Sequence, residues 1–136
     1  MLKLIYGAKG SGKTKRIIDA ANASLEESDG YVVFITDTNR YMSDIKYQIR
    51  AVNLADYSVC TEEQFIGFVK GVIAGNHDIT HFFIDGIHRF LKKDVSELEW
   101  VYGELSRLAV ASEIKFTITV SKDFDGLPEF LKKFVD

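Results

Sequence analysis

Residues 7–14 read GAKGSGKT and follow directly on the apolar run LKLIY at residues 2–6. The stretch satisfies the pattern G-x-x-x-x-G-K-[ST], which has a physical meaning where a strand leads into the loop and a helix leaves it. Both flanks comply, because LKLIY is typical of a short buried strand and residues 14–27 contain neither proline nor glycine. The segment therefore predicts a strand, a phosphate-binding loop and a helix in succession.

Each residue type in this loop has a chemical role. The glycines allow backbone N–H groups to turn inward around a phosphate, and the helix that follows adds the positive end of its dipole. We expect Lys13 to reach the β- and γ-phosphates and the Thr14 hydroxyl to ligate Mg²⁺. A side chain at Gly12 would obstruct the phosphate, and Ser11 is expected to add a backbone contact. The predicted nucleotide-binding residues are Gly7, Gly10, Ser11, Gly12, Lys13 and Thr14.

The overall composition is that of an ordinary globular protein. The chain has 136 residues, 46% hydrophobic and 27% charged, which is enough for one nucleotide-binding domain over residues 1–136. A net charge of −3 gives no long-range attraction to nucleic acid or to an acidic membrane, although a local basic strip stays open. No apolar stretch approaches the roughly 18 residues of a spanning helix. Cys60 is the single cysteine, which rules out an internal disulfide and predicts a reducing compartment; its side chain is expected to be a small buried hydrophobe. Together with the lack of a spanning stretch, this predicts a cytoplasmic location.

The rest of the chain alternates between strand and helix patterns. Thr61 with Gln64 forms a capping box, and Ser96 with Glu99 is expected to cap a later helix. We expect strands at residues 31–37, 57–60, 81–85 and 114–121, and helices at residues 43–50, 62–75, 98–108 and 127–134. This rhythm predicts a three-layer α/β fold with a mainly parallel central sheet.

Ligands of such sheets bind at the carboxyl ends of the strands. The loop at residues 7–14, Asp37, Asp85 and Ser121 each lie at or just past the end of an expected strand. We therefore expect these residues to lie close together. Trp100 we assign to the hydrophobic core.

Asp85 supplies the second half of the predicted site. It follows the apolar residues FFI, a pattern in which an acid at the end of a strand holds Mg²⁺ through water. An Asp that caps a turn with Gly86 is the structural alternative. Beside a phosphate loop the metal interpretation is favoured, because an ion held by Thr14 needs an anionic partner. The predicted metal-binding residues are thus Thr14 and Asp85.

With these two motifs the chain resembles the P-loop NTPase superfamily over its whole length. In the branch that includes RecA-like and AAA-type ATPases, the strand after the Asp-bearing one lies between it and the loop strand and ends in a polar sensor. Thr119 and Ser121 stand at the corresponding positions. The other branch contains kinases and GTPases. Its GTPases show the motif D-x-x-G, which the DGIH at residues 85–88 does not match. The resemblance therefore favours the first branch.

A narrower resemblance is carried by GAKGSGKTK, VVFITDTNRYMSD, FFIDG and PEFLKKF. These segments are similar to a group of small Firmicutes P-loop proteins that carry labels such as ATP-binding protein or, loosely, twitching-motility ATPase. The latter label does not fit, because a pilus-retraction ATPase has an extra N-terminal domain and acidic and histidine motifs that this short chain cannot accommodate. The resemblance implies nucleotide binding and no particular reaction.

The chain departs from the favoured branch at Gly86, where many of those ATPases have a catalytic Glu that orients and deprotonates water. The candidates that replace this Glu are Asp37, then Glu62 or Glu63, then His88. A turn-forming role for Asp37 and a helix-dipole role for the glutamates are the structural alternatives. The histidines make no convincing metal site and are expected to be solvated or structural. The predicted catalytic residues are Lys13, Asp37 and Asp85.

Two arginines and an aromatic pair are further candidates. Arg40 could contact phosphate or substrate, and Arg89 could act as an arginine finger toward a neighbouring subunit. For each arginine, a position on the surface with no ligand contact is the commoner role. Tyr41 and Met42 could stack on a base, although packing is the commoner role of such a pair.

Three functions fit these residues. The first is an ATP-binding protein with slow, Mg²⁺-dependent hydrolysis, acting as a switch or an ATPase regulated by a partner. The second is a phosphotransferase acting on a nucleotide or another small molecule, and the third is a non-catalytic interaction module whose nucleotide supports the fold or an oligomer. The expected ligands are ATP, or another nucleoside triphosphate, and Mg²⁺. A protein partner or self-association is compatible with all three.

Overall fold

Five parallel strands form the central layer of the protein, whose computed structural model describes residues 1–135. They are β1 (Leu2–Tyr6), β2 (Tyr31–Thr36), β3 (Arg50–Asn53), β4 (Ile79–Ile84) and β5 (Lys115–Val120). Their order in the sheet is β1-β5-β4-β2-β3. β5 thus lies between the loop strand and the Asp-bearing strand, as the resemblance to the first branch predicts. Asp136, the last residue of the predicted domain, lies outside the described residues.

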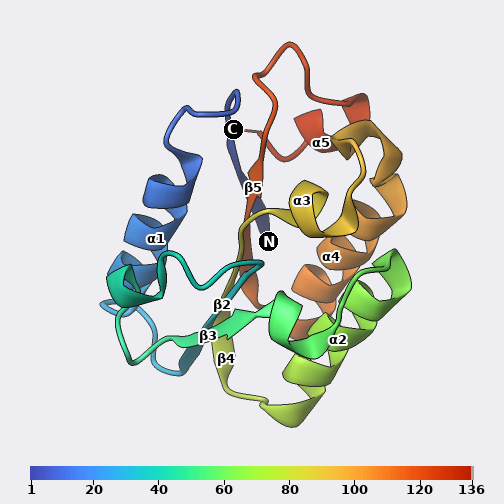
Figure 1. Cartoon of the computed structure of the whole chain (residues 1–136). Helices are drawn as coiled ribbons and strands as arrows, with labels where there is room; N and C mark the ends of the chain where they lie inside the picture. The colour runs from blue at the N-terminus through green and yellow to red at the C-terminus, as the bar shows by residue number, and fades with distance from the viewer. Residues whose placement is uncertain (136) are drawn as a thin grey trace.

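Helices cover both faces of this sheet (Figure 1). One face carries α1 (Lys13–Ser24). The other carries α2 (Glu62–Gly75), α3 (Ile87–Leu91), α4 (Glu99–Ser112) and α5 (Glu129–Lys132). The arrangement confirms the predicted three-layer α/β fold, consistent with a P-loop NTPase-like protein, and the sheet is entirely parallel. Within residues 1–135, no helix combines the length and apolar character needed to cross a bilayer.

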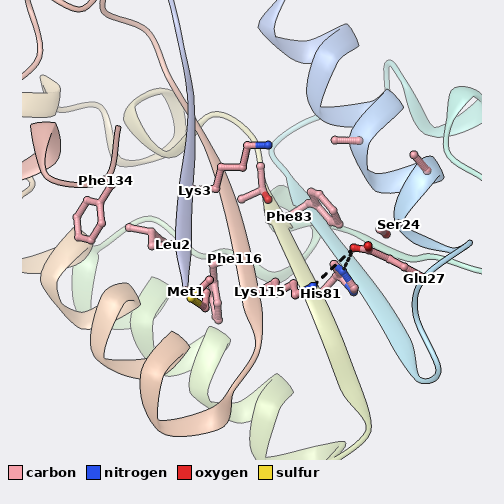
Figure 2. Close-up of a pocket in the computed structure, with 13 residues that line it drawn as sticks. Met1, Leu2, Lys3, Ser24, Glu27, His81, Phe83, Lys115, Phe116 and Phe134 are labelled. Carbon is pink, nitrogen blue, oxygen red and sulfur yellow. Dashed lines mark hydrogen bonds and ion pairs between the residues drawn. The ribbon is translucent and has the colours of Figure 1, made fainter. Parts of the chain in front are cut away.

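The amino ends of the strands form the edge opposite the phosphate loop, and a cavity of about 540 Å³ opens there beside α1 (Figure 2). His81 lies buried in its wall. Its Nε2 atom is 2.8 Å from Glu27 Oε1, its Nδ1 atom is 2.8 Å from Thr80 Oγ1, and its ring stacks on Phe83. Both ring nitrogens therefore have partners, and His81 is structural, as expected.

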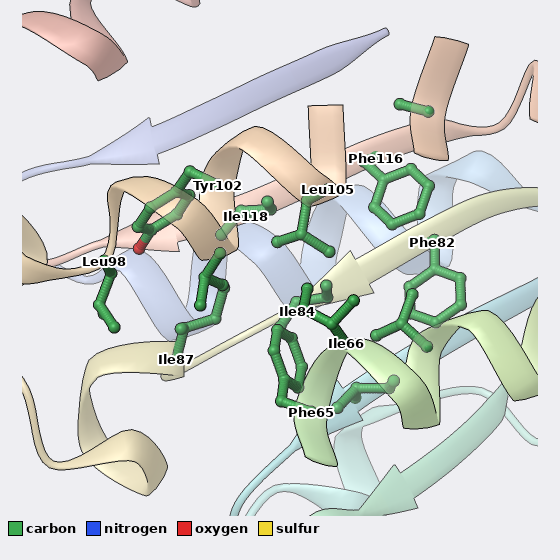
Figure 3. Packing of buried hydrophobic residues seen from close by; sticks show 14 of the residues in the cluster. Phe65, Ile66, Phe82, Ile84, Ile87, Leu98, Tyr102, Leu105, Phe116 and Ile118 are labelled. Carbon is green, nitrogen blue, oxygen red and sulfur yellow. The ribbon is translucent and has the colours of Figure 1, made fainter. Parts of the chain in front are cut away.

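The larger part of the core lies on the face covered by α2 and α4 (Figure 3). Side chains alternate across a strand, so in β4 Phe82 and Ile84 point to this face while Phe83 packs against the α1 side. The Phe82 ring stacks on Phe116 of β5, with ring centroids 5.0 Å apart. In the sequence, strands that are buried on both faces appear as continuous runs of apolar residues. This burial explains why β4 and β5 were readily predicted.

The prediction of a helix at residues 43–50 is wrong. A short 3-10 turn at Met42–Asp44 is followed by an extended Ile45. The side chain of Asn22 on α1 bonds the backbone on either side of Ile45, donating to Asp44 O at 2.9 Å and accepting from Lys46 N at 3.0 Å. Ile45 and Ile49 are both buried, so their four-residue spacing resembled that of a helix, although Asn22 bonds the Asp44 carbonyl and the Lys46 N–H.

Two further local predictions need correction. Residues 57–60 form no strand, because a 3-10 turn at Leu54–Tyr57 ends with Ser58 in the left-handed region, at φ 56°; the extra strand is β3, just before it. Ser96 does not cap α4. Instead the Asp94 carboxylate accepts bonds from Ser96 N at 3.1 Å and Ser96 Oγ at 2.6 Å, which stabilises a separate 3-10 turn. The capping box of Thr61 on α2 is confirmed.

Two side chains expected inside the protein are exposed. Trp100 is 46% exposed, because its neighbours Val101 and Tyr102 take the face of α4 that meets the sheet. Cys60 is also exposed, in the turn before α2, where its backbone N–H donates to Gln64 Oε1.

Candidate functional site

The loop at residues 7–14 connects β1 to α1 and lies at the carboxyl ends of the strands. Gly12 adopts φ 84° as the residue before the helix, a conformation that side chains disfavour. A Cβ atom built on Gly12 would meet no protein atom within 4 Å. Within the protein, position 12 therefore favours glycine because of this backbone angle and not because of a clash with another atom. The first N–H groups of α1 point back toward the loop, as at any helix N-terminus, and the first turn carries no acidic residue and no side-chain cap that would engage them.

Lys13 lies inside the loop rather than in the hydrophobic core. Its side chain is buried, and its Nζ atom donates to Ala8 O at 2.9 Å. Ser11 N donates to the same carbonyl at 3.1 Å. Burial, followed by the charge of Arg16, lowers the pKa of Lys13, while Asp85 acts in the opposite direction. The ammonium group is thus held against a single neutral carbonyl at the mouth of the loop.

Asp85 connects this loop to the end of β4. Asp85 is only 2% exposed. The Thr14 hydroxyl donates to Asp85 Oδ2 at 3.1 Å, although the two residues are 71 positions apart in the sequence. The Thr119 hydroxyl donates to its Oδ1 atom at 2.7 Å and accepts from Gly86 N at 3.2 Å. Thr119 therefore orients the carboxylate, while Ser121, two residues further along the chain and just past β5, lines the cavity. Thr14 and Asp85, the two residues predicted to bind metal, are thus in direct contact.

The donor atoms at this point are a hydroxyl and a carboxylate. Hard oxygen donors of this kind suit Mg²⁺, which commonly keeps water and phosphate oxygens as its other ligands. Within residues 1–135, no group of three or more His, Cys, Asp and Glu side chains could hold a metal ion by itself. Thr14 and Asp85 are the residues that would hold such an ion, and phosphate and water oxygens would supply its other ligands.

Asp37, the predicted base, lies at the end of β2 and is engaged by Arg89. Arg89 Nη2 donates to Asp37 Oδ1 at 2.9 Å, and Arg89 Nε donates to Oδ2 at 3.2 Å. Arg89 Nη2 also lies 3.5 Å from Asp85 Oδ2. The hydrogen bonds that Arg89 donates to Asp37, opposed by burial, raise the pKa of Arg89. Arg89 thus points into its own site and pairs with two acids of its own chain.

Gly86 makes room for this arginine. The residue has φ 92°, and a Cβ atom built on it would lie 2.3 Å from Arg89 Nη2 and 2.6 Å from its Cζ. A Glu at position 86 would consequently displace the guanidinium. Asp85 precedes Gly86, the residue before α3, so the helical i, i+4 pattern does not apply to Asp85 and Arg89 and gave no sequence signal for this contact.

The remaining candidate bases are placed differently. His88 lines the cavity beside the loop, and its pKa is lowered by burial and then by the charges of Arg89 and Lys13. Glu62 pairs with Lys93, and neither Glu62 nor Glu63 is among the residues that line this cavity.

A cavity of about 1280 Å³ extends from the phosphate loop along α1. Beyond the loop it is lined by Arg40 and Tyr41, whose guanidinium and ring lie 5.5 Å apart. Met42 packs against the cluster beneath α1. Of the predicted pair, Tyr41 is therefore the side chain that can reach a ligand. The full lining is Lys9, Gly10, Gly12, Lys13, Thr14, Lys15, Ile18, Asp19, Arg40, Tyr41, Asp44, Asp85, His88, Arg89 and Ser121.

Comparison with known proteins gives a structural likeness only. No protein-family model matches the chain, and no curated protein matches it. Among solved structures, domain III of the replication initiation protein DnaA from Thermotoga maritima is similar, at 17% sequence identity and a TM-score of 0.47. The match covers 98% of this chain and 50% of that one, so the chain spans half the length of that structure. The function proposed below depends on the site's own geometry.

Proposed function

We propose that this protein binds a nucleoside triphosphate, with ATP as the first candidate, together with Mg²⁺, and hydrolyses it slowly as a switch or partner-regulated ATPase. The contact between Thr14 Oγ1 and Asp85 Oδ2 at 3.1 Å carries the proposal. It joins the phosphate loop to a buried acid at the end of a different strand. A glycine-rich turn with no ligand has no need of such a pair.

The roles follow from the positions of the side chains. The N–H groups of the loop and of the first turn of α1 hold the phosphates, and Lys13 exchanges the Ala8 carbonyl for a phosphate oxygen. Thr14 and Asp85 hold the metal. When bound, Mg²⁺ supplies the neutralising charge that the phosphates require.

Slow turnover is expected because neither position 86 nor position 37 offers a free carboxylate that could accept a proton from water. Position 86 has no side chain, and both oxygens of Asp37 accept bonds from Arg89. Asp37 is the proposed base once that pair loosens. A protein partner or a second copy would then raise the rate by changing this pairing.

The test is phosphate release from ATP, measured as Mg²⁺ is titrated, for the wild type and for Thr14→Ala. Lys70→Ala is the control, because Lys70 is exposed on α2, pairs with Glu104 and does not line this cavity. We expect Thr14→Ala to need at least about tenfold more Mg²⁺ for half-maximal release, the scale of a lost charge-assisted contact. An unchanged Mg²⁺ requirement in Thr14→Ala would contradict the assignment of the metal site.

A phosphotransferase is the second candidate, and the extent of the cavity favours it. The cavity, at about 1280 Å³, exceeds the roughly 300–1,000 Å³ of most small-molecule sites. Arg40 and Tyr41 lie at its far part, where they could hold an anionic or aromatic acceptor. Phosphate release measured with and without nucleosides, nucleotides and sugars separates the two candidates. Transfer to an acceptor well above hydrolysis would favour this second reaction.

A further inference from the structure

Arg89 carries one inference that goes beyond nucleotide binding, although it rests on the metal site of the proposed function. The guanidinium lies across Gly86 and reaches two acids from different strands, Asp37 after β2 and Asp85 after β4. The side chain of Arg89 is 41% exposed, so it is free to move toward the cavity that it lines. The two acids are more enclosed, at 20% and 3%.

The two contacts of Arg89 are unequal. The pair with Asp37 has two bonds, at 2.9 and 3.2 Å. The single contact with Asp85 is 3.5 Å long, beyond the usual range of about 2.7–3.2 Å for such bonds. A bidentate pair between an arginine and a carboxylate is also the stronger arrangement. Arg89 is thus anchored on Asp37 and can leave Asp85 without losing its main partner.

The oxygen of Asp85 that Arg89 approaches is Oδ2, the atom that accepts the Thr14 hydroxyl. The other oxygen, Oδ1, is held by Thr119. A metal ion held by Thr14 and Asp85 would need this Oδ2 atom. The positive charge of Arg89 already lies beside it. Two cations at one carboxylate oxygen repel each other.

We propose that Arg89 is the internal counter-ion of the metal site: in the nucleotide-free protein it neutralises Asp85 and disfavours a free divalent cation. Phosphate groups bound in the loop offer Arg89 new negative charge, so it gives up Asp85 while it stays on Asp37. Metal binding then depends on nucleotide, which prevents the buried acids from taking up free metal. No arginine from a second subunit is required for this role.

The experiment measures Mn²⁺ binding by electron paramagnetic resonance, first with the metal alone and then with ATP present. Arg89→Met removes the charge, and Arg89→Gln removes it while keeping a polar contact to Asp37. Both variants should bind Mn²⁺ alone at least about tenfold more tightly than the wild type, the scale of a lost charged contact. The factor by which ATP tightens Mn²⁺ binding should fall correspondingly, because this coupling is reciprocal.

Arg107→Met is the matched control, since Arg107 pairs with Glu104 on α4, away from the lining of this cavity. It should behave as the wild type does. If Arg89→Met and Arg89→Gln bind Mn²⁺ alone no better than the wild type, the counter-ion role is wrong. If the wild type binds no nucleotide, the proposed function fails, while the Mn²⁺ measurements without nucleotide still decide the role of Arg89.

Discussion

Thr119→Val should destabilise the protein much more than its small change of shape suggests. The hydroxyl of Thr119 donates to Asp85 Oδ1 at 2.7 Å and accepts from Gly86 N at 3.2 Å. Valine has a similar shape but leaves a buried carboxylate oxygen and a backbone N–H without this partner. Each unsatisfied buried group costs about 1–3 kcal/mol, with charged groups at the upper end. We therefore expect the free energy of unfolding to fall by about 2–4 kcal/mol.

The assay is urea unfolding followed by circular dichroism. With a urea dependence of about 2 kcal/mol per molar, the middle of the usual range, this loss lowers the midpoint by roughly 1–2 M. Thr117→Val is the matched control, because Thr117 lies on the same strand and face but is not a partner of Asp85. It lines the open cavity at the amino end of the sheet, and its replacement should cost less than about 0.5 kcal/mol. Equal effects of the two substitutions would refute the reasoning.

Three further predictions concern the acids and their neighbours. Asp37→Asn should lower the rate of hydrolysis by about 10²- to 10⁴-fold, as for a lost general base, and leave nucleotide affinity nearly unchanged. Asp85→Asn should lower the rate and also weaken Mg²⁺–nucleotide binding. Phosphate release measures the rate, and titration calorimetry measures the affinity. Gly86→Ala should cost about 1–3 kcal/mol, because its Cβ atom meets Arg89 and φ is 92°, as urea unfolding would show. Burial and the charge of Arg89 lower the pKa of His88, so stability should be full above histidine's ordinary value of about 6.5 and decline as the pH falls below it. His88→Gln should reduce that decline between pH 7.5 and pH 5.5.

The strands and the phosphate loop could be predicted because their signals are local. Runs such as YVVFIT are apolar on both faces only in a buried parallel sheet, and the spacing of Gly12, Lys13 and Thr14 fixes both the loop and the helix after it. Segments whose structure depends on distant partners could not be predicted. Residues 43–50 show this, since Asn22 on another element bonds their backbone.

The sequence could predict which candidate residues lie at this edge of the sheet, but not how they pair. The ends of β2 and β4 placed Asp37 and Asp85 at one edge of the sheet, as the strand pattern implied. That Arg89 would join both acids depends on the backbone angle of Gly86 and on the depth of each carboxylate. Composition could not place Trp100 either, because a helix of this type has one buried face and an aromatic residue can lie on either side.

Nucleotide binding by the loop is the central claim, and titration calorimetry of ATP with Mg²⁺ tests it most directly. Lys13→Ala is compared with Lys70→Ala, whose lysine is exposed on α2, pairs with Glu104 and does not line the cavity. The buried Lys13 ammonium contacts a carbonyl within the loop, so its loss should leave the protein folded. We predict that the wild type and Lys70→Ala bind with affinities within about threefold, and that Lys13→Ala loses at least about 100-fold, as for a charged hydrogen bond to phosphate. Equal affinity of Lys13→Ala and the wild type would contradict the account.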